Sequence, residues 1–322
     1  MAHDRASRLA RAGGHAALAA RSAAQAPALI GHWQTISAAL FPPPPVHFQR
    51  ERWDTPDGDF IDIDFAGNAQ AHLMVLLHGL EGCSDSHYAR LLAHEMPAAG
   101  WRIAIPHWRG CSGEPNRKPR AYHSGDTKEL DWILRRFGHQ VDVVGVSLGG
   151  NVLLKWMGER AGEAKAIVRR AAAISAPLDL AAAGAALDRG VNRLLYTRMF
   201  LSTLKPKSLA QLDRFPGIFD RAKLSRSTTF REFDNLYTAP MHGFRDVDHY
   251  WTSSSSGPWL ERIAVPTLVL NARNDPFLPE RALVEASRKT APSVLLEFPR
   301  TGGHVGFRGP WLAQRLIRFF QA

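Results

Sequence analysis

A short serine motif bracketed by glycines is the strongest candidate for chemistry in this sequence. Gly145-Val146-Ser147-Leu148-Gly149 fits the pattern G-x-S-x-G and lies between an apolar run, Val141 to Val146, and a helix-compatible stretch from Asn151 onward. A tight strand-to-helix turn needs glycines because Cβ atoms would collide there, and it lifts the serine hydroxyl out of the sheet. It also leaves the N–H of Leu148 free to bind an oxyanion. Ser147 is therefore the predicted nucleophile, with an idle serine in a structural turn as the alternative.

A serine hydroxyl needs a base, and the chain offers one in a suitable order. In this type of arrangement an acid and then a histidine follow the serine, each in a loop after a later strand. Asp275 follows the strand predicted at Thr267 to Leu270, and His304 follows the strand predicted at Val294 to Phe298. We expect His304 to take the proton from Ser147, and Asp275 to orient and stabilise the imidazole. Taken singly, either residue could be an ordinary loop residue.

Other acids and histidines stay open as alternatives. Asp179 follows an earlier predicted strand and could be the acid in place of Asp275. His242 and His249, like Asp246 and Asp248, are weaker candidates. They lie in a segment where the alternation of strands and helices breaks down.

A second oxyanion donor is expected in the loop after the apolar run Leu73 to Leu77. That loop reads His78-Gly79-Leu80-Glu81-Gly82, and the Leu80 N–H is the predicted donor. His78 itself is expected to brace the loop by hydrogen bonding rather than to react.

Two further residues invite a functional interpretation, and a structural one is favoured for both. Arg109 could meet an anionic group of a substrate, but bracing of the loops is the preferred reading. Cys111 could be a second nucleophile, but chain order implies no partner for it, so a packed thiol is expected. His87 and His94 share a predicted helix and are taken as surface residues. No motif for a metal or a nucleotide is found, and no cofactor is expected.

The elements that must position these residues alternate along the chain. Strands are predicted at 73–77, 102–106, 141–146, 166–175, 267–271 and 294–298, and helices at 87–98, 128–137, 149–160, 280–290 and 311–320. Apolar strands that alternate with helices predict an α/β fold with a mostly parallel sheet. Ahead of these elements, the alternating pattern of residues 46–53 and 60–65 predicts an antiparallel hairpin at a sheet edge.

One segment interrupts this alternation, and another precedes it. Residues 177–260 mix aromatic side chains with many Arg and Asp, which predicts a helical insertion acting as a lid. Its aromatic side chains could line an acyl-chain pocket or form its own core. Arginines such as Arg189, Arg193 and Arg198 could rest on lipid, so peripheral membrane contact through the lid is an open expectation. Residues 1–30 are expected to form a poorly ordered extension or a loose helix, and 31–322 the catalytic domain.

Composition excludes several classes of protein. The 322 residues are 45% hydrophobic and carry a formal net charge of +10, but the positive charge is scattered and no nucleic-acid-binding motif is present. Two cysteines, Cys83 and Cys111, cannot build a disulfide framework and favour a reducing, cytoplasmic location. No apolar run is long enough to span a bilayer. The oligomeric state is left open.

Several loop segments resemble one branch of a known superfamily. They are His78-Gly79-Leu80-Glu81-Gly82, Asp85-Ser86-His87-Tyr88, Arg109-Gly110-Cys111-Ser112-Gly113-Glu114-Pro115-Asn116, Tyr122-His123-Ser124-Gly125 and, near the start, Gly31-His32-Trp33-Gln34-Thr35. The chain resembles the YheT-like branch of the α/β-hydrolases from about residue 31 to its end. The resemblance implies an α/β-hydrolase fold and a relative of carboxylesterases and of acylglycerol or phospholipid lipases. The triad of that branch carries over onto Ser147, Asp275 and His304.

These observations predict a serine hydrolase that cleaves carboxylic esters through an acyl-enzyme. Short- to medium-chain esters or acylglycerols are the expected substrates, whether small molecules or lipids. An acyltransferase with the same triad is the first alternative, because the fold and the triad would be identical. A non-catalytic binding protein on a hydrolase scaffold is the second.

Overall fold

The computed structural model describes residues 29–322. All but the last two residues of the extension predicted at 1–30 therefore lie outside the described part. The described chain begins with a helical segment, residues 29–40. An extended proline-rich stretch then leads to the first strand.

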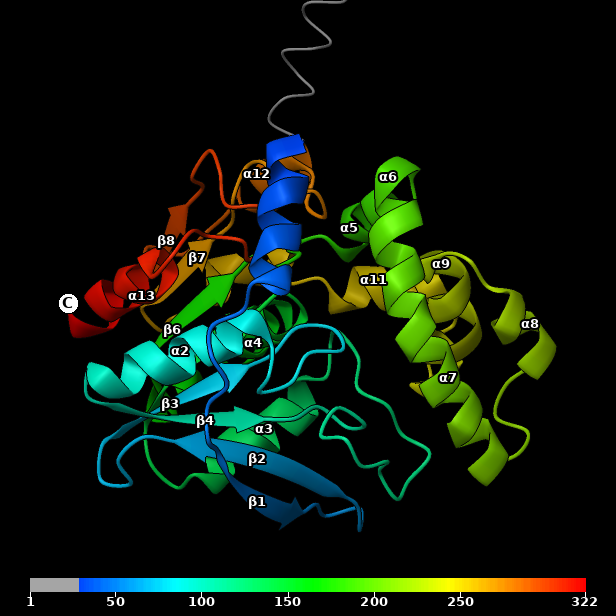
Figure 1. Ribbon diagram of the computed structural model, residues 1–322, viewed down its shortest axis with the longest axis horizontal. Coiled ribbons are helices and arrows are strands. Elements are labelled where there is room, and N and C mark those ends of the chain that lie inside the picture. The colour runs from blue at the N-terminus through cyan, green and yellow to red at the C-terminus, as the bar shows by residue number, and fades with distance from the viewer. Residues whose placement is uncertain (1–28) are drawn as a thin grey trace, which may run out of the picture.

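A single sheet of eight strands forms the centre of the molecule, in the order β1-β2-β4-β3-β5-β6-β7-β8 (Figure 1). The strands are β1 (Gln49–Asp54), β2 (Phe60–Ala66), β3 (His72–Leu77), β4 (Trp101–Pro106), β5 (Val141–Val146), β6 (Val168–Ile174), β7 (Thr267–Leu270) and β8 (Val294–Glu297). β1 and β2 pair antiparallel, β2 also pairs antiparallel with β4, and all other pairs are parallel. The predicted mostly parallel sheet with an antiparallel hairpin at its edge is confirmed.

Helices cover both faces of this sheet. They are α2 (His87–Ala98), α3 (Thr127–Arg136), α4 (Leu148–Arg160), the 3₁₀ helix η1 (Ala161–Ala166), α12 (Glu280–Ala286) and α13 (Trp311–Gln321). Alternate residues of β3 enter different cores, because side chains of a strand point to opposite faces in turn. Met74 and Leu76 join the core under α2 and α13, whereas Val75 and Leu77 join the core under α3 and α4.

The segment between β6 and β7 is a cluster of helices at one end of the sheet, as predicted from the break in the alternation (Figure 1). Its elements are α5 (Leu180–Leu187), α6 (Gly190–Asn192), η2 (Arg193–Thr197), α7 (Arg198–Arg214), α8 (Arg221–Arg226), α9 (Phe230–Phe233), η3 (Asp234–Thr238), α10 (Ala239–Met241), α11 (Val247–Ser254) and η4 (Gly257–Arg262). Phe230, Tyr250 and Trp251 form one small core of this insertion, and Phe233 and Tyr237 belong to another.

Three predicted boundaries were wrong by two residues or more. The first strand, expected from residue 46, begins at Gln49, and the other two differ for local reasons. The helix expected to reach residue 290 ends at Ala286. Ser287 donates from its Oγ to Val284 O at 3.1 Å, a local bond that competes with helix propagation. The strand expected from residue 166 begins at Val168 because the preceding residues form η1. Within residues 29–322, no helix is both long and apolar enough to cross a membrane.

Candidate active site

Ser147 lies on the tight turn between β5 and α4. Its backbone has a φ of 52° and a ψ of −118°, a conformation that a non-glycine residue keeps only where its surroundings enforce it. Hydrogen bonds hold the turn on both sides, since Ser147 N donates to Ile174 O at 2.8 Å and Asn151 N donates to Ser147 O at 3.0 Å. The strained turn thereby fixes the direction of the serine side chain.

Two glycines of the motif allow α4 to approach the sheet this closely. A Cβ atom on Gly145 would lie 2.6 Å from Gly149 O, and one on Gly149 would lie 2.4 Å from Leu77 O. Both distances are shorter than any real contact of a methyl carbon with a backbone oxygen. The G-x-S-x-G spacing therefore follows from the packing of β5, α4 and β3.

The structure brings together the three residues that sequence order had singled out. His304 Nε2 lies 3.0 Å from Ser147 Oγ, and His304 Nδ1 lies 2.8 Å from Asp275 Oδ2. The other carboxylate oxygen, Oδ1, accepts from Phe277 N at 2.8 Å, which fixes the orientation of the buried Asp275. Because Nδ1 faces a carboxylate it carries the ring proton, and Nε2 is left as the acceptor for the serine hydroxyl.

The histidine loop is held by the N-terminal helical segment, a contact that sequence reasoning missed. Thr35 Oγ1 accepts from His304 N at 2.8 Å and donates to Gly31 O at 2.8 Å. Gln34 Oε1 accepts from Gly302 N at 3.0 Å. The resemblance of residues 31–35 to the YheT-like branch was the only sign that this segment mattered.

The same segment also holds the loop that carries the acid. Asn274, next to Asp275, donates from Nδ2 to Gln34 Oε1 at 2.9 Å and accepts at Oδ1 from Gly303 N at 3.0 Å. Backbone packing is close enough that a Cβ on Gly31 would lie 2.0 Å from Asn274 O. Gln34 thus links the acid loop to the histidine loop.

The two predicted oxyanion donors lie beside Ser147 at the cavity described below. Leu80 and Leu148 both line it. Among the hydrogen bonds of residues 29–322, neither the Leu80 N–H nor the Leu148 N–H has a protein acceptor. The N–H groups on either side of Leu80 are occupied, since Gly79 N donates to Tyr88 OH and Glu81 N donates to Tyr122 OH, each at 2.9 Å. The loop therefore leaves one backbone donor available.

His78 braces this loop from below. Its Nδ1 donates to Gly79 O at 2.8 Å, and its Nε2 accepts from Trp108 N at 3.0 Å. Burial lowers the pKa of His78 to about 3, so the ring is neutral and can accept at Nε2. This arrangement matches the bracing role expected from the sequence.

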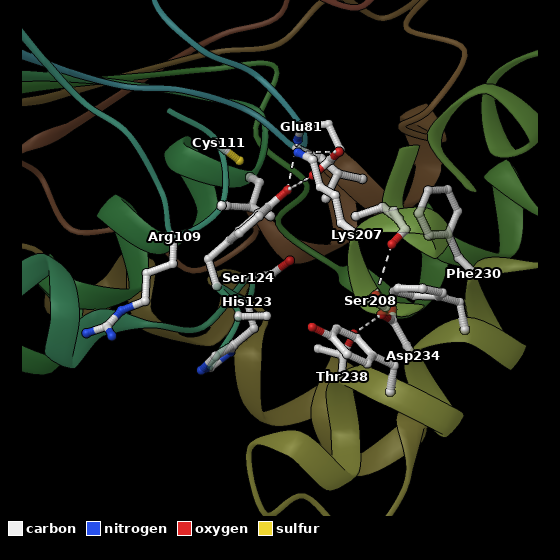
Figure 2. A pocket seen from close by; sticks show the side chains of 18 of the residues that line it. Glu81, Arg109, Cys111, His123, Ser124, Lys207, Ser208, Phe230, Asp234 and Thr238 are labelled. Carbon is white, nitrogen blue, oxygen red and sulfur yellow. Dashed lines mark hydrogen bonds and ion pairs between the residues drawn. The ribbon is translucent and has the colours of Figure 1, made fainter. Parts of the chain in front are cut away.

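An ion pair connects the loop of residues 78–82 to the insertion. Lys207, on α7, lies with its Nζ 2.8 Å from Glu81 Oε2, and Figure 2 shows the two side chains directed at one another across the pocket wall. Tyr122 OH donates to the other carboxylate oxygen of Glu81 at 3.0 Å. Glu81 has a positive φ of 55°, so these partners hold a conformation that the backbone alone disfavours.

Above Ser147 and His304 lies a cavity of about 550 Å³. Much of its wall comes from the insertion and is apolar. The apolar lining includes Leu180, Leu187, Leu204, Phe230, Phe233, Tyr237, Trp251, Phe277 and Leu278. Aromatic side chains of the insertion such as Phe230, Phe233 and Tyr237 therefore both form its cores and line this cavity.

Arg109 and Cys111 take structural positions. The Arg109 guanidinium pairs with Asp57, Asp59 and Glu129 at 2.9, 2.9 and 2.6 Å, and Figure 2 shows it turned away from Lys207. Burial raises the pKa of the Cys111 thiol to about 12, which keeps it protonated and unreactive. Both residues also border the cavity, Arg109 with its guanidinium held by three carboxylates and Cys111 as a protonated thiol.

The alternative acids and bases have other partners. Asp179 caps α5 by accepting from Ala182 N at 3.0 Å. Asp246 caps α11 in the same way, and Asp248 pairs with Arg231 at 2.8 Å. His249 Nδ1 accepts from Arg245 N at 3.2 Å, and the His242 ring packs on His123 with centroids 4.3 Å apart. No group of three or more metal-ligating side chains occurs within residues 29–322.

Comparison with known proteins agrees with this architecture. A family model described as the α/β hydrolase fold matches residues 72–308. The chain is 38% identical over 284 residues to the Escherichia coli protein named "Putative esterase YheT", covering 83% of this chain and 82% of that one. It is 30% identical to mouse phospholipase ABHD3, covering 88% and 73%, and 27% identical to yeast monoacylglycerol lipase, covering 85% and 63%.

Solved structures share the fold at lower identity. A membrane phospholipase A described as a bacterial virulence factor superposes with a TM-score of 0.57 at 18% identity, covering 96% of both chains. An esterase of Pyrococcus furiosus gives a TM-score of 0.55 at 14% identity, covering 87% of this chain and 96% of that one. By its family match, its sheet and its identity to YheT, the chain belongs to the YheT-like branch of the α/β-hydrolase family.

Proposed function

We propose that this protein is a carboxylic ester hydrolase that works through an acyl-enzyme on Ser147. The observation that carries the proposal is the continuous hydrogen-bonded path from Ser147 Oγ through His304 to the buried Asp275. An alcohol is a weak nucleophile at neutral pH, and a neutral imidazole at 3.0 Å from it is placed to remove its proton during attack.

The steps follow from the positions of these atoms. Ser147 Oγ attacks the ester carbonyl carbon while its proton passes to His304 Nε2. The resulting imidazolium is stabilised by the Asp275 carboxylate on Nδ1. The tetrahedral intermediate expels the alcohol, which takes the proton from Nε2. Water, deprotonated by the same nitrogen, then attacks the acyl-enzyme. The second tetrahedral intermediate breaks its bond to Ser147 Oγ, which takes the proton back from Nε2, and the acid is released.

The charge that develops on the carbonyl oxygen needs donors that are already in place. We assign this role to the N–H groups of Leu80 and Leu148, which adjoin Ser147 and have no competing acceptor within residues 29–322. Such donors lower the barrier because they need not reorganise as the charge forms.

The cavity supports lipid-like or other apolar acyl esters as substrates. Its volume of about 550 Å³ and its aliphatic and aromatic wall suit a hydrocarbon chain. The relatives named phospholipase and monoacylglycerol lipase act on such compounds by name. We assign the insertion, residues 177–260, the role of a lid that forms the acyl site within a catalytic domain spanning residues 31–322.

The direct test compares Ser147→Ala with the unmodified protein. Turnover of p-nitrophenyl butyrate should fall by about four to six decades, as in other triad enzymes, and labelling by a fluorophosphonate probe should disappear. Ser202→Ala is the control, because Ser202 is exposed on α7 outside the cavity lining and its Oγ donates within its own helix to Met199 O at 2.7 Å. Near-normal turnover by Ser147→Ala would refute the proposal. Product analysis with added alcohol distinguishes hydrolysis from acyl transfer.

A further inference from the structure

Two segments of the described chain expose large apolar side chains to solvent. On the helical segment 29–40, Leu29, Ile30 and Trp33 are exposed, Trp33 by 58%. In the insertion, Val191, Leu194, Leu195 and Met199 are exposed, Leu194 by 71%. We call these seven side chains the apolar face. Exposed apolar side chains gathered in this way mark an interaction surface more often than scattered ones do.

The two segments are packed against each other, so their exposed side chains belong to one surface. His32 Nδ1 lies 3.0 Å from Tyr196 OH, and the two rings stack with centroids 5.7 Å apart. Ile36 packs in a small core with Tyr196 and Phe200. Figure 1 shows the N-terminal helix and α6 together at the same end of the molecule. Trp33 and Leu195 immediately follow and precede the two contacting residues.

The charged residues that lie between Val191 and Met199 of the apolar face, and just before them at position 189, are arginines. Arg189, Arg193 and Arg198 lie among its insertion residues, and none of them forms an ion pair within the described residues 29–322. The sequence holds no Asp or Glu from 189 to 212 and no charged residue from 29 to 41. Apolar and aromatic side chains flanked by unpaired arginines suit the boundary between the headgroups and the acyl chains of an anionic bilayer.

We propose that the apolar face docks this protein on the surface of a bilayer containing anionic phospholipid. The contact is peripheral, with the seven side chains entering the headgroup region and the three arginines facing lipid phosphates. This docking proposal deepens the proposed function because it names the bilayer as the source of a lipid ester. The docking itself requires no hydrolysis.

The apolar face lies close to the candidate active site. The Tyr196 ring, which stacks on His32, meets the Phe277 ring edge-on with centroids 4.6 Å apart. Phe277 in turn stacks on the His304 imidazole at 4.2 Å and lines the cavity. A chain of ring contacts therefore runs from His32, next to Trp33 of the apolar face, to His304, so a docked protein would hold its cavity near the acyl chains.

Charge argues against two other occupants. A symmetric dimer through this face would bring the arginines of both copies together, because such an interface places the same patch opposite itself. Residues 1–28 carry Arg5, Arg8, Arg11 and Arg21 against a single Asp4. That segment therefore has the same sign of charge as the surface.

The test is cosedimentation of the full-length protein with phospholipid vesicles. Vesicles of phosphatidylcholine mixed with phosphatidylglycerol should bind the protein, and added salt should weaken the binding. The double variant Leu194→Asp, Met199→Asp should bind at least about tenfold more weakly, since it places two charges in the apolar layer. Arg189→Gln with Arg198→Gln should lose the preference for anionic vesicles over pure phosphatidylcholine.

Val284→Asp is the matched control, because Val284 is 48% exposed on α12 and lies outside the apolar face. Every variant should hydrolyse a soluble p-nitrophenyl ester at the unmodified rate, which shows that it is folded and separates this test from that of the proposed function. Failure of the unmodified protein to bind anionic vesicles would overturn the proposal. So would equal binding by the Leu194→Asp, Met199→Asp variant, or a dimer in solution that this variant dissociates.

Discussion

Replacing Thr35 with valine should impair catalysis although Thr35 lies outside the cavity. Valine has nearly the same volume but lacks Oγ1, which accepts from His304 N at 2.8 Å. The substitution leaves the backbone N–H of the proposed general base without a partner at a partly buried position. An unpaired buried donor costs about 1–3 kcal/mol.

The His304 loop can relieve that cost only by moving, and movement lengthens the path to Ser147 Oγ. If the full cost appears in the barrier, kcat falls by about 5- to 160-fold, since each 1.36 kcal/mol is a factor of ten. KM should change little, because the cavity lining does not include Thr35. Steady-state kinetics with a soluble p-nitrophenyl ester measure both constants.

Two comparisons decide whether Thr35 positions the histidine or only stabilises the fold. Thr35→Ser keeps the hydroxyl and should restore most of kcat. Ser37→Ala removes a hydroxyl from the same helix, where its Oγ only donates to Gln34 O at 3.3 Å, and should leave kcat unchanged. A Thr35→Val protein that melts at a lower temperature but keeps its kcat would refute the positioning role.

Two further predictions concern the insertion. Lys207→Met should lower kcat by about two- to fivefold, the scale of a half-exposed ion pair, because Glu81 loses the cation that holds the proposed oxyanion loop. Lys207→Arg keeps the ion pair and should preserve kcat. Equal kcat in both variants would contradict a link between this ion pair and catalysis. Burial raises the pKa of Asp234 to about 6, so the folded protein binds this proton more tightly than the unfolded chain does and loses stability as the pH rises through that value. Between about pH 5 and pH 7.5 the loss should be about 1 kcal/mol, and Asp234→Asn should abolish it in urea unfolding at the two pH values.

Most of the fold could be predicted because its signals are local. Each parallel strand is a short apolar run bounded by polar residues, and helix α2 was predicted at the residues where it occurs. The order of Ser147, Asp275 and His304 could also be inferred, because turns after successive strands meet at one edge of a parallel sheet. The assignment of these residues to catalysis remains a prediction for the kinetic tests above.

The supports of the site could not be predicted, because they depend on contacts between distant parts of the chain. Thr35 and His304 are separated by 269 positions, and nothing in their neighbourhoods marks them as partners. The pairing of Lys207 with Glu81 depends on how the insertion lies on the sheet, which no periodicity reveals. Residue patterns indicate which face of an element is buried, but not which distant side chain covers it.

The bond from His304 N to Thr35 Oγ1 has a consequence for biosynthesis. Thr35 is synthesised 269 positions before His304, so a nascent chain holds Ser147 and its turn before the proposed base exists. The proposed triad should therefore be complete only after residue 304 has been made and the helical segment 29–40 has packed on its loop.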